Sequence, residues 1–442
     1  MKRTVTTILC LLTMALLLLF FVQERTSVFK LKPLNGVYVD VPQPEFNMKS
    51  FSSGTYQANL EKHLRYHFGF REALIRLYNQ YAWDFFHKPM NQTIKLGRED
   101  WIYGKREYDN YFVSYMYNIT PDRSVMKAKF DREAARLYKV QRILDEYDVF
   151  LFMTLLPGKE FVYPEYLPEF EGPMKEPFHA IEYYPEVFDS LGVRYIDVLQ
   201  IFKDWKGKTD YPLYPKTGGH WSFVASAMAF DTIIRYVEHE SGMNLRNIRI
   251  GDVHPGETMV PDNDLENLLN LFRPIQPNQN YYADAQVILD STASKPEFIL
   301  IGDSYFWNWT KSVPLASVFS HYYYWYYNST VHYNPRGKHT SELDILKEIL
   351  NVKIIDLSYS PVQLYVFSNG FLPKALLYLT HEDAEIEAKI DEIASTLDKP
   401  EEEKRKSARD LLFTSPEDYF PDLAADGVPS TRNSRIGEIR NH

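Results

Sequence analysis

Four short apolar segments that alternate with amphipathic ones constrain the fold of this chain most strongly. The apolar segments are 149–157, 193–199, 297–304 and 352–357, and the segments with helical spacing are 122–148, 179–192, 222–242 and 343–350. Buried strands connected by amphipathic helices are typical of a parallel sheet with helices on both faces. We therefore predict an α/β fold with a mostly parallel sheet, in which ligand sites lie at the carboxyl ends of strands.

The N-terminus predicts a transmembrane anchor. About nineteen residues without charge, Thr4 to Val22, follow Lys2 and Arg3, and such a run is long enough to cross a bilayer as a helix. The positive flank places the N-terminus in the cytoplasm and the remaining chain outside. A cleaved signal peptide is the alternative, but no cleavage site of small residues follows the run.

Further along the chain we expect three parts. Residues 24–60 form a stalk or lead-in, residues 61–371 form one α/β domain, and residues 372–442 form a charged helical tail with a loosely ordered end. Within the domain, 61–86 predicts an amphipathic helix broken near Gly69, and 94–103 predicts a short hairpin.

Composition excludes several classes of function. The 442 residues contain 49 Lys and Arg against 59 Asp and Glu, so the net charge of −10 disfavours nucleic-acid binding. Histidines are scattered, which does not indicate a metal site, and the sequence has neither a P-loop nor a GxGxxG motif, so no cofactor is expected. The only cysteine, Cys10, lies in the apolar N-terminal run, so the exported part has no disulfide.

A serine at the end of an apolar strand is the candidate nucleophile. Gly302-Asp303-Ser304 follows the segment 297–301, and a tight glycine turn there would expose the hydroxyl of Ser304. A serine needs a histidine base, and that base needs an orienting group. The best base is His220, which two glycines precede and a predicted helix with Ser222 as its N-cap follows, although a structural histidine at a helix start fits the spacing equally well. The competing bases are His254, His321, His332 and His339.

Other residues could complete this site. Asn308 and Arg336 are candidate oxyanion donors, or else an ordinary turn and surface residue. Trp221, Tyr305 and Lys159 are candidates for substrate binding, although Lys159 could equally be a solvated residue after its strand. The aromatic run 321–328 predicts a buried strand, with a glycan platform as the alternative.

The order of several motifs resembles the SGNH-hydrolase-like alginate O-acetyltransferase family, which includes AlgX-like, AlgJ-like and DHHW-related proteins. The matching stretches are 96–104, 155–168, 216–222, 263–271, 298–307 and 354–365. The resemblance implies a three-layer SGNH-like fold over residues 60–371. It also implies that Ser304 is the nucleophile and His220 the base.

One position departs from the family pattern. The family commonly has an aspartate two residues before the histidine, where this chain has Gly218. A Ser–His dyad could suffice, with Thr217 or a backbone carbonyl orienting the imidazole. Another carboxylate, Asp210 or Asp303, could replace the missing acid. The third alternative is a non-catalytic relative that binds polymer.

The resemblance implies a single-pass protein of the bacterial cytoplasmic membrane whose periplasmic domain acetylates an exported polysaccharide. It also implies an acetyl donor relayed by a membrane-bound O-acyltransferase. A polysaccharide acetylesterase with the same chemistry is the near alternative, because exclusion of water decides between transfer and hydrolysis. A glycan-binding protein of the export machinery and a membrane-tethered structural module are the non-enzymatic alternatives.

Overall fold

A six-stranded sheet forms the centre of the computed structural model. The model describes residues 2–36, 39–113, 122–170, 178–327, 330–332, 349, 351–366, 376, 384–400, 403–405 and 407–408. The strand order is β11-β10-β9-β12-β3-β4, and every neighbouring pair is parallel except β10 and β11. The strands are β3 (Phe150–Leu155), β4 (Tyr195–Asp197), β9 (Glu297–Gly302), β10 (His321–Tyr326), β11 (Thr330–His332) and β12 (Ile354–Tyr359). The mostly parallel α/β sheet expected from the sequence is thus confirmed.

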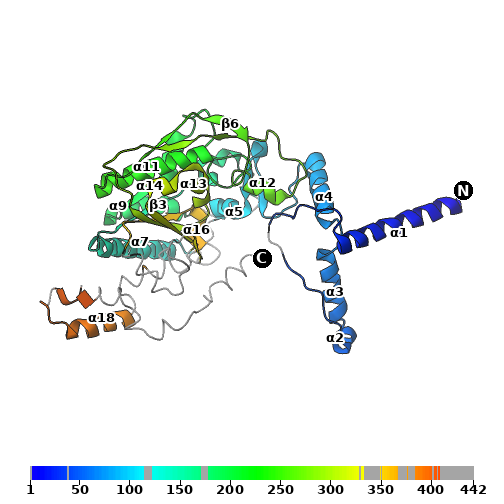
Figure 1. The fold of residues 1–442 in the computed structure, drawn as a ribbon, viewed down its shortest axis with the longest axis horizontal. Helices are drawn as coiled ribbons and strands as arrows, with labels where there is room; N and C mark the ends of the chain where they lie inside the picture. Colours follow the sequence, from blue (N-terminus) through cyan, green and yellow to red (C-terminus); the bar gives the residue numbers. More distant parts are fainter. Residues whose placement is uncertain are drawn as a thin grey trace.

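Helices cover the sheet on both sides (Figure 1). They are α7 (Arg123–Asp145), α9 (Ala180–Leu191), α10 (Val198–Trp205), α11 (Phe223–Ser241), α13 (Phe306–Ser312) and α14 (Leu315–Val318). In Figure 1, α11 and α13 lie above the strands and α7 lies below them. One hydrophobic core joins these layers, and β3, β9 and β12 are buried almost throughout because helices cover both faces.

Two sequence predictions differ from the structure in extent. The strand expected over 193–199 ends at Asp197, because the Asp197 carboxylate accepts a hydrogen bond from the amide of Gln200 and begins α10 instead. The helix expected over 343–350 lies outside the described residues apart from Ile349. The aromatic run does form a strand, β10, and buries Tyr323, Tyr324 and Trp325.

Smaller elements frame the sheet. They are β1 (Ile94–Leu96), β2 (Ile102–Gly104), α5 (Lys105–Val113), α8 (Lys159–Val162), β5 (Ile248–Ile250), β6 (His254–Glu257), α12 (Asp264–Leu269), β7 (Gln279–Tyr282), β8 (Ala285–Val287), α16 (Pro361–Val366) and α18 (Ala384–Thr396). β1 and β2 pair antiparallel, which confirms the predicted hairpin. α18 lies in the charged segment that was predicted to be helical.

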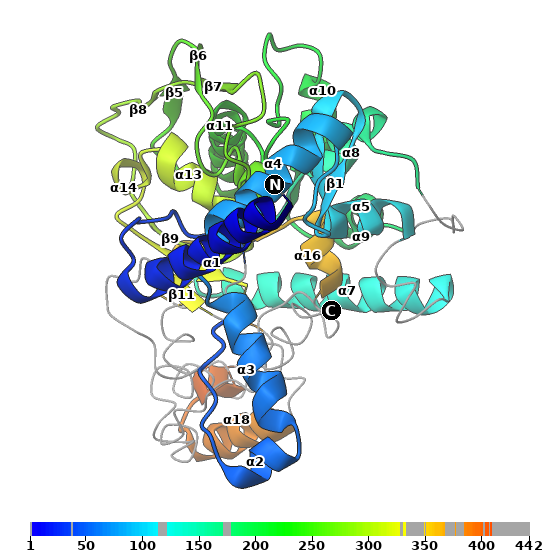
Figure 2. The same cartoon turned by 90° about the vertical axis from the view of Figure 1, so that its right-hand side faces the viewer.

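The N-terminal helices stand apart from the sheet. α1 (Lys2–Thr26) projects away from the domain, while α2 (Met48–Ser52), α3 (Thr55–Tyr66) and α4 (Arg71–Phe86) run across its direction (Figure 1). Seen from the side of α1, α3 and α4 extend in opposite directions from the base of that helix (Figure 2). The predicted break near Gly69 lies between α3 and α4. Residues Thr4–Thr26 are long and apolar enough to cross a membrane.

Candidate functional site

Ser304 lies directly after the central strand β9. Gly302 ends that strand where a Cβ atom would come within 2.4 Å of the Ser358 carbonyl oxygen on β12, so only glycine fits this close approach. The Asp303 carboxylate then braces the turn, because it accepts hydrogen bonds from the amides of Tyr305 (3.2 Å) and Ser360 (2.9 Å). The turn leaves Ser304 half-buried at the carboxyl edge of the sheet, as the sequence predicted.

His220 reaches this serine from the loop before α11. Ser222 caps that helix through a hydrogen bond from the amide of Ala225 to its hydroxyl oxygen, which confirms the predicted N-cap. His220 Nε2 lies 2.6 Å from Ser304 Oγ, although 84 residues separate the two in sequence. The geometry therefore joins the base and nucleophile expected from the sequence in one hydrogen bond.

The third member of the site is Asp264, which sequence reasoning missed. Its Oδ2 lies 2.6 Å from His220 Nδ1, and its Oδ1 accepts hydrogen bonds of 2.8 Å from the amides of Gly219 and Leu265. Asp264 is the first residue of α12, inside the segment 263–271 that resembled the family. The arrangement Asp264–His220–Ser304 has the connectivity of a serine-hydrolase triad.

The two carboxylates proposed from the sequence for this role lie elsewhere. Asp303 is buried, and its two oxygens accept hydrogen bonds from the Tyr305 amide in its own turn and from the Ser360 amide after β12. Asp210 is exposed in the loop after α10. Thr217 donates its hydroxyl to the Asp262 carbonyl oxygen at 3.3 Å and does not orient the imidazole. The orienting contact on His220 Nδ1 comes instead from Asp264.

The pKa shifts of His220 and Asp264 favour the charged forms of both side chains. Burial by itself lowers the pKa of His220, but the adjacent Asp264 carboxylate outweighs it, and the net pKa is raised. Burial likewise opposes ionisation of Asp264, while His220 and two backbone amides lower its pKa overall. The side chains of His220 and Asp264 remain 17% and 26% exposed, so solvent and substrate can reach them.

Lys159 is neither a substrate contact nor solvated, contrary to both interpretations of the sequence. Its side chain is buried, and Nζ donates to the carbonyl oxygens of Ile102, Pro215, Lys216 and Gly218 at 2.8–2.9 Å. Burial lowers the pKa of its ammonium group. Because three of these carbonyls lie in the loop that carries His220, Lys159 fixes the position of that loop.

The other predicted substrate contacts are also buried. Trp221 is fully enclosed and donates from Nε1 to the Tyr305 carbonyl oxygen at 3.2 Å. Tyr305 packs its ring edge-on against His220, with ring centres 5.0 Å apart, and its hydroxyl meets Tyr214 at 3.1 Å. Tyr305 thus packs against the imidazole, and Trp221 packs against Tyr305 behind it.

Of the two predicted oxyanion donors, the structure describes only Asn308. Asn308 is fully buried, and its amide nitrogen donates to the Trp221 carbonyl oxygen at 2.8 Å, so it braces the chain after His220. Arg336 lies outside the described residues. Burial raises the pKa of the Tyr327 phenol, a group that the sequence analysis did not single out, and the nearby Ser304 side chain partly lowers it. Tyr327 follows β10 in the aromatic run and adopts a left-handed backbone with φ of 50°.

A buried carboxyl group beside Lys159 predicts an unusual pH dependence of stability. Burial, assisted by the negative charge of Glu107, raises the pKa of Glu160 to about 8. Within the described part of the chain, neither carboxyl oxygen hydrogen-bonds to another residue. Glu160 is therefore protonated in the folded protein at neutral pH, whereas the unfolded chain ionises it near its ordinary pKa.

We expect the free energy of unfolding to fall as the pH rises from 5 to 7.5, because the folded state binds the additional proton. From the raised pKa of Glu160, the loss is about 3 kcal/mol. Glu160→Gln keeps the shape without the ionisation and should remove most of this dependence. Urea unfolding of both chains at the two pH values measures it. Parallel pH profiles for the two chains would contradict the prediction.

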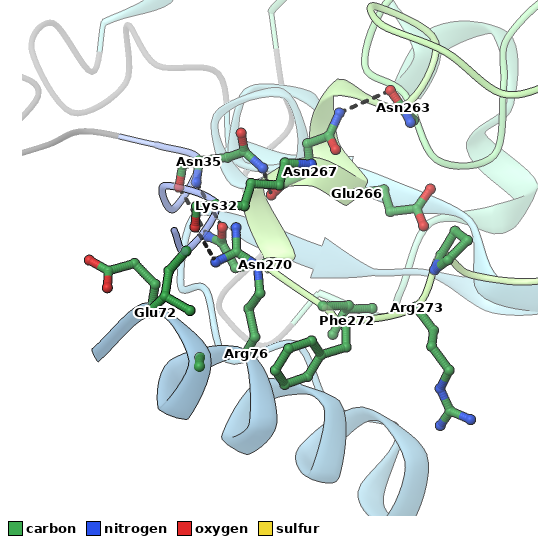
Figure 3. Close-up of a pocket in the computed structure, with 14 residues that line it drawn as sticks. Lys32, Asn35, Glu72, Arg76, Asn263, Glu266, Asn267, Asn270, Phe272 and Arg273 are labelled. Carbon is green, nitrogen blue, oxygen red and sulfur yellow. Dashed lines mark hydrogen bonds between the residues drawn. The ribbon is translucent and has the colours of Figure 1, made fainter. Parts of the chain in front are cut away.

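A cavity of about 320 Å³ lies between α12 and α4 and is also bordered by residues 31–35 (Figure 3). It is lined by Leu31, Lys32, Asn35, Glu72, Ala73, Arg76, Asn263, Glu266, Asn267, Asn270, Leu271, Phe272, Arg273 and Pro274. Asn35 and Asn270 exchange backbone-to-side-chain bonds of 2.7 and 3.0 Å across it. The lining includes none of the triad residues, so the cavity adjoins the helix of Asp264 without containing the site.

A comparison with protein families gives one match. Residues 94–311 match the family model for the SGNH hydrolase-like domain of the acetyltransferase AlgX, which confirms the resemblance and fold class predicted from the sequence. A search of proteins with curated function gave no significant match.

Three solved structures resemble the chain. The O-acetyltransferase domain of Pseudomonas putida AlgJ is 15% identical, with 65% of this chain and 98% of that one covered and a TM-score of 0.39. Pseudomonas aeruginosa AlgX is 12% identical, covering 65% and 66%, with a TM-score of 0.41. Bacillus cereus PatB1 is 14% identical, covering 64% and 100%, with a TM-score of 0.38.

Proposed function

We propose that the chain is an O-acetyltransferase that modifies an exported polysaccharide, on the premise that residues 94–311, which match the SGNH hydrolase-like domain of the acetyltransferase AlgX, form a domain of that family. The observation that carries the proposal is the continuous hydrogen-bonded line Asp264–His220–Ser304, with 2.6 Å at each step. In this proposal Ser304 is the nucleophile, His220 the general base and acid, and Asp264 the residue that orients the imidazole.

The reaction proceeds in two halves. Ser304 Oγ attacks the carbonyl carbon of an acetyl donor while His220 Nε2 takes the hydroxyl proton, and the tetrahedral adduct collapses as His220 returns that proton to the leaving group. A sugar hydroxyl then attacks the carbonyl carbon of acetyl-Ser304 while His220 takes its proton. The bond to Ser304 Oγ breaks as His220 returns that proton to Ser304, and the acetyl group remains as an ester on the sugar. The backbone amide of Ser304 is positioned to donate to the oxyanion in both halves.

Asp264 also weakens the non-catalytic alternative. That alternative depended on Gly218, which left the imidazole without its usual aspartate. A carboxylate at 2.6 Å from Nδ1 supplies the same tautomer and the same charge from another segment. Hydrolysis is the second candidate function, because the partial exposure of His220 and Asp264 gives water access to the acetyl-serine.

The location of the reaction is part of the proposal. The apolar helix Thr4–Thr26 would serve as an uncleaved anchor in the bacterial cytoplasmic membrane, with Lys2 and Arg3 inside and the domain in the periplasm. A membrane-bound O-acyltransferase would supply the acetyl group from the other side of the membrane. This arrangement would bring the donor to the domain without a soluble carrier.

The test follows the acetyl group itself. The full chain in detergent is incubated with p-nitrophenyl acetate and its intact mass is measured, followed by fragmentation of the labelled peptide. We expect one acetyl group on Ser304. When an alginate-derived oligosaccharide is added, this acetyl group should move from Ser304 to the oligosaccharide. Release only as acetate would favour the esterase, and a folded chain with neither adduct nor turnover would refute both enzymatic proposals.

A further inference from the structure

Helix α4 exposes large apolar side chains that a surface helix usually buries. Toward solvent it presents an apolar row, here called the outer stripe, which consists of Leu74, Leu77, Tyr78, Tyr81 and Phe85. Leu77 is 60% exposed and Phe85 is 74% exposed. Their spacing places them along one face of the helix. A soluble helix normally turns such a face inward, so the outer stripe requires an explanation.

The inner face of α4 is already occupied, in part by polar side chains that bond to the domain and in part by Ala82 and Trp83, which are buried. Arg76 is buried and donates to the carbonyl oxygens of Lys32 (3.0 Å) and Pro33 (2.8 Å). Asn79 donates to the carbonyl oxygen of Leu269, at the end of α12, at 2.7 Å. Gln80 accepts hydrogen bonds of 3.0–3.1 Å from two consecutive backbone amides after α12. These bonds fix which way α4 faces, so the outer stripe cannot rotate into the domain without breaking them.

The start of α4 is packed against the end of the apolar helix α1. A Cβ atom on Gly69 would lie 2.1 Å from the Phe20 carbonyl oxygen, so the two backbones touch. The rings of Phe20 and Phe70 lie 6.0 Å apart, and the Gln23 side chain closes the end of α1 by bonding to the backbone of Phe29. The outer stripe therefore begins next to the point where α1 leaves the domain.

The views from two directions give the orientation of these helices. In Figure 1, α4 runs across the direction of α1, and the sheet lies on the far side of α4 from the free end of α1. In Figure 2, which looks from the side of α1, α4 lies in front of the domain. If α1 crosses a bilayer, α4 lies along the surface of that bilayer, between it and the catalytic domain.

We propose that the outer stripe of α4 lies in the interfacial region of the membrane that α1 spans. Leucine, tyrosine and phenylalanine side chains are those that enter the boundary between headgroups and acyl chains. The charge at the edge of the stripe is neutralised, because Asp84 pairs with Arg273 at 2.5 Å. This inference depends on the anchor in the proposed function and adds a second membrane contact to it.

The contact has a consequence for the reaction. The inner face of α4 bonds to the end of α12, and the first residue of α12 is Asp264. The domain would then meet the membrane through a helix that also supports the triad. A site held at that position is suited to an acetyl donor that arrives from within the membrane.

The test measures depth in the bilayer. The full chain, with Cys10→Ser and a single new cysteine labelled with an environment-sensitive fluorophore, is reconstituted into vesicles of phosphatidylethanolamine and phosphatidylglycerol. Lipids brominated near the top of the acyl chain serve as quenchers. Tyr81→Cys reports the outer stripe, Val22→Cys reports the end of α1, and Lys139→Cys, exposed on α7, is the control away from both.

We expect bromolipid to reduce emission at positions 81 and 22 and to leave position 139 unchanged. Adding Leu77→Glu and Phe85→Glu should abolish the quenching at position 81 and leave the quenching at position 22. Hydrolysis of p-nitrophenyl acetate should persist in this variant. Quenching at 22 without quenching at 81 would overturn the membrane contact while the anchor stands, and would assign the stripe to a protein surface. Quenching at neither position would overturn the anchor as well.

Discussion

Ser304→Ala is expected to lower kcat for hydrolysis of p-nitrophenyl acetate by about 10⁶-fold, because removal of the nucleophile disables the triad as a unit. The hydroxyl of Ser304 is the atom that His220 Nε2 contacts at 2.6 Å. Alanine removes that oxygen without adding bulk, so the fold should be retained. Initial rates of acetate release, measured together with the melting temperature, give the result.

Ser320→Ala provides the matched control, because Ser320 is an exposed serine just before β10. We expect that variant to keep the rate of the parent chain. The acetyl adduct on the intact protein should disappear with Ser304→Ala and persist with Ser320→Ala. Persistence of the adduct in a folded Ser304→Ala chain would mean that another residue accepts the acetyl group, and the proposed role of Ser304 would be wrong.

The sequence predicted Ser304 and His220 as the candidate nucleophile and base because each has a strong local signal. An apolar strand followed by a tight glycine turn is visible within eight residues. A histidine that follows two glycines and precedes a helix cap is visible over a similarly short stretch. Both signals depend on backbone geometry that neighbouring residues determine. The structure then shows the bond between the two residues, which lie 84 positions apart.

Asp264 was missed because its role depends on a contact across 44 residues. The signal that could have found it was present: an aspartate opening a short helix inside the segment 263–271 that already resembled the family. The sequence suggested other carboxylates instead, Asp210 because it lies close to His220 in the chain and Asp303 because it precedes Ser304. At position 218 a Cβ atom would lie 2.6 Å from the Asp262 carbonyl oxygen, so no side chain fits there.

Lys159 and α4 show a second limit of sequence reasoning. A lysine after a strand gives no indication that carbonyl oxygens from two distant segments will surround its ammonium group. For α4, periodicity predicts two faces but not which of them meets the domain. That choice depends on Arg76 and Gln80 finding backbone partners in residues 32–33 and 272–273, which are remote from α4 in sequence.

Asp264→Asn is expected to lower kcat by about 10⁴-fold while leaving KM nearly unchanged, because an amide can stabilise the wrong tautomer of the imidazole. The side-chain nitrogen of the new amide would donate toward His220 Nδ1, so Nε2 would carry the proton and could no longer accept one from Ser304. The substitution preserves the shape of the side chain. Asp210→Asn, which removes an exposed aspartate from the loop after α10, is the matched control and should retain full activity.

The pH profile separates this effect from a loss of folding. Asp264 raises the pKa of His220, so in the parent chain kcat/KM should rise with pH through an inflection above the ordinary histidine value. Without the Asp264 carboxylate, only the weaker charges of Asp303 and Glu107 oppose the effect of burial on the pKa of His220, so the inflection of the residual activity should move to lower pH. An unchanged inflection with full activity would show that Asp264 does not act on His220, and the chain would then function as a Ser–His dyad.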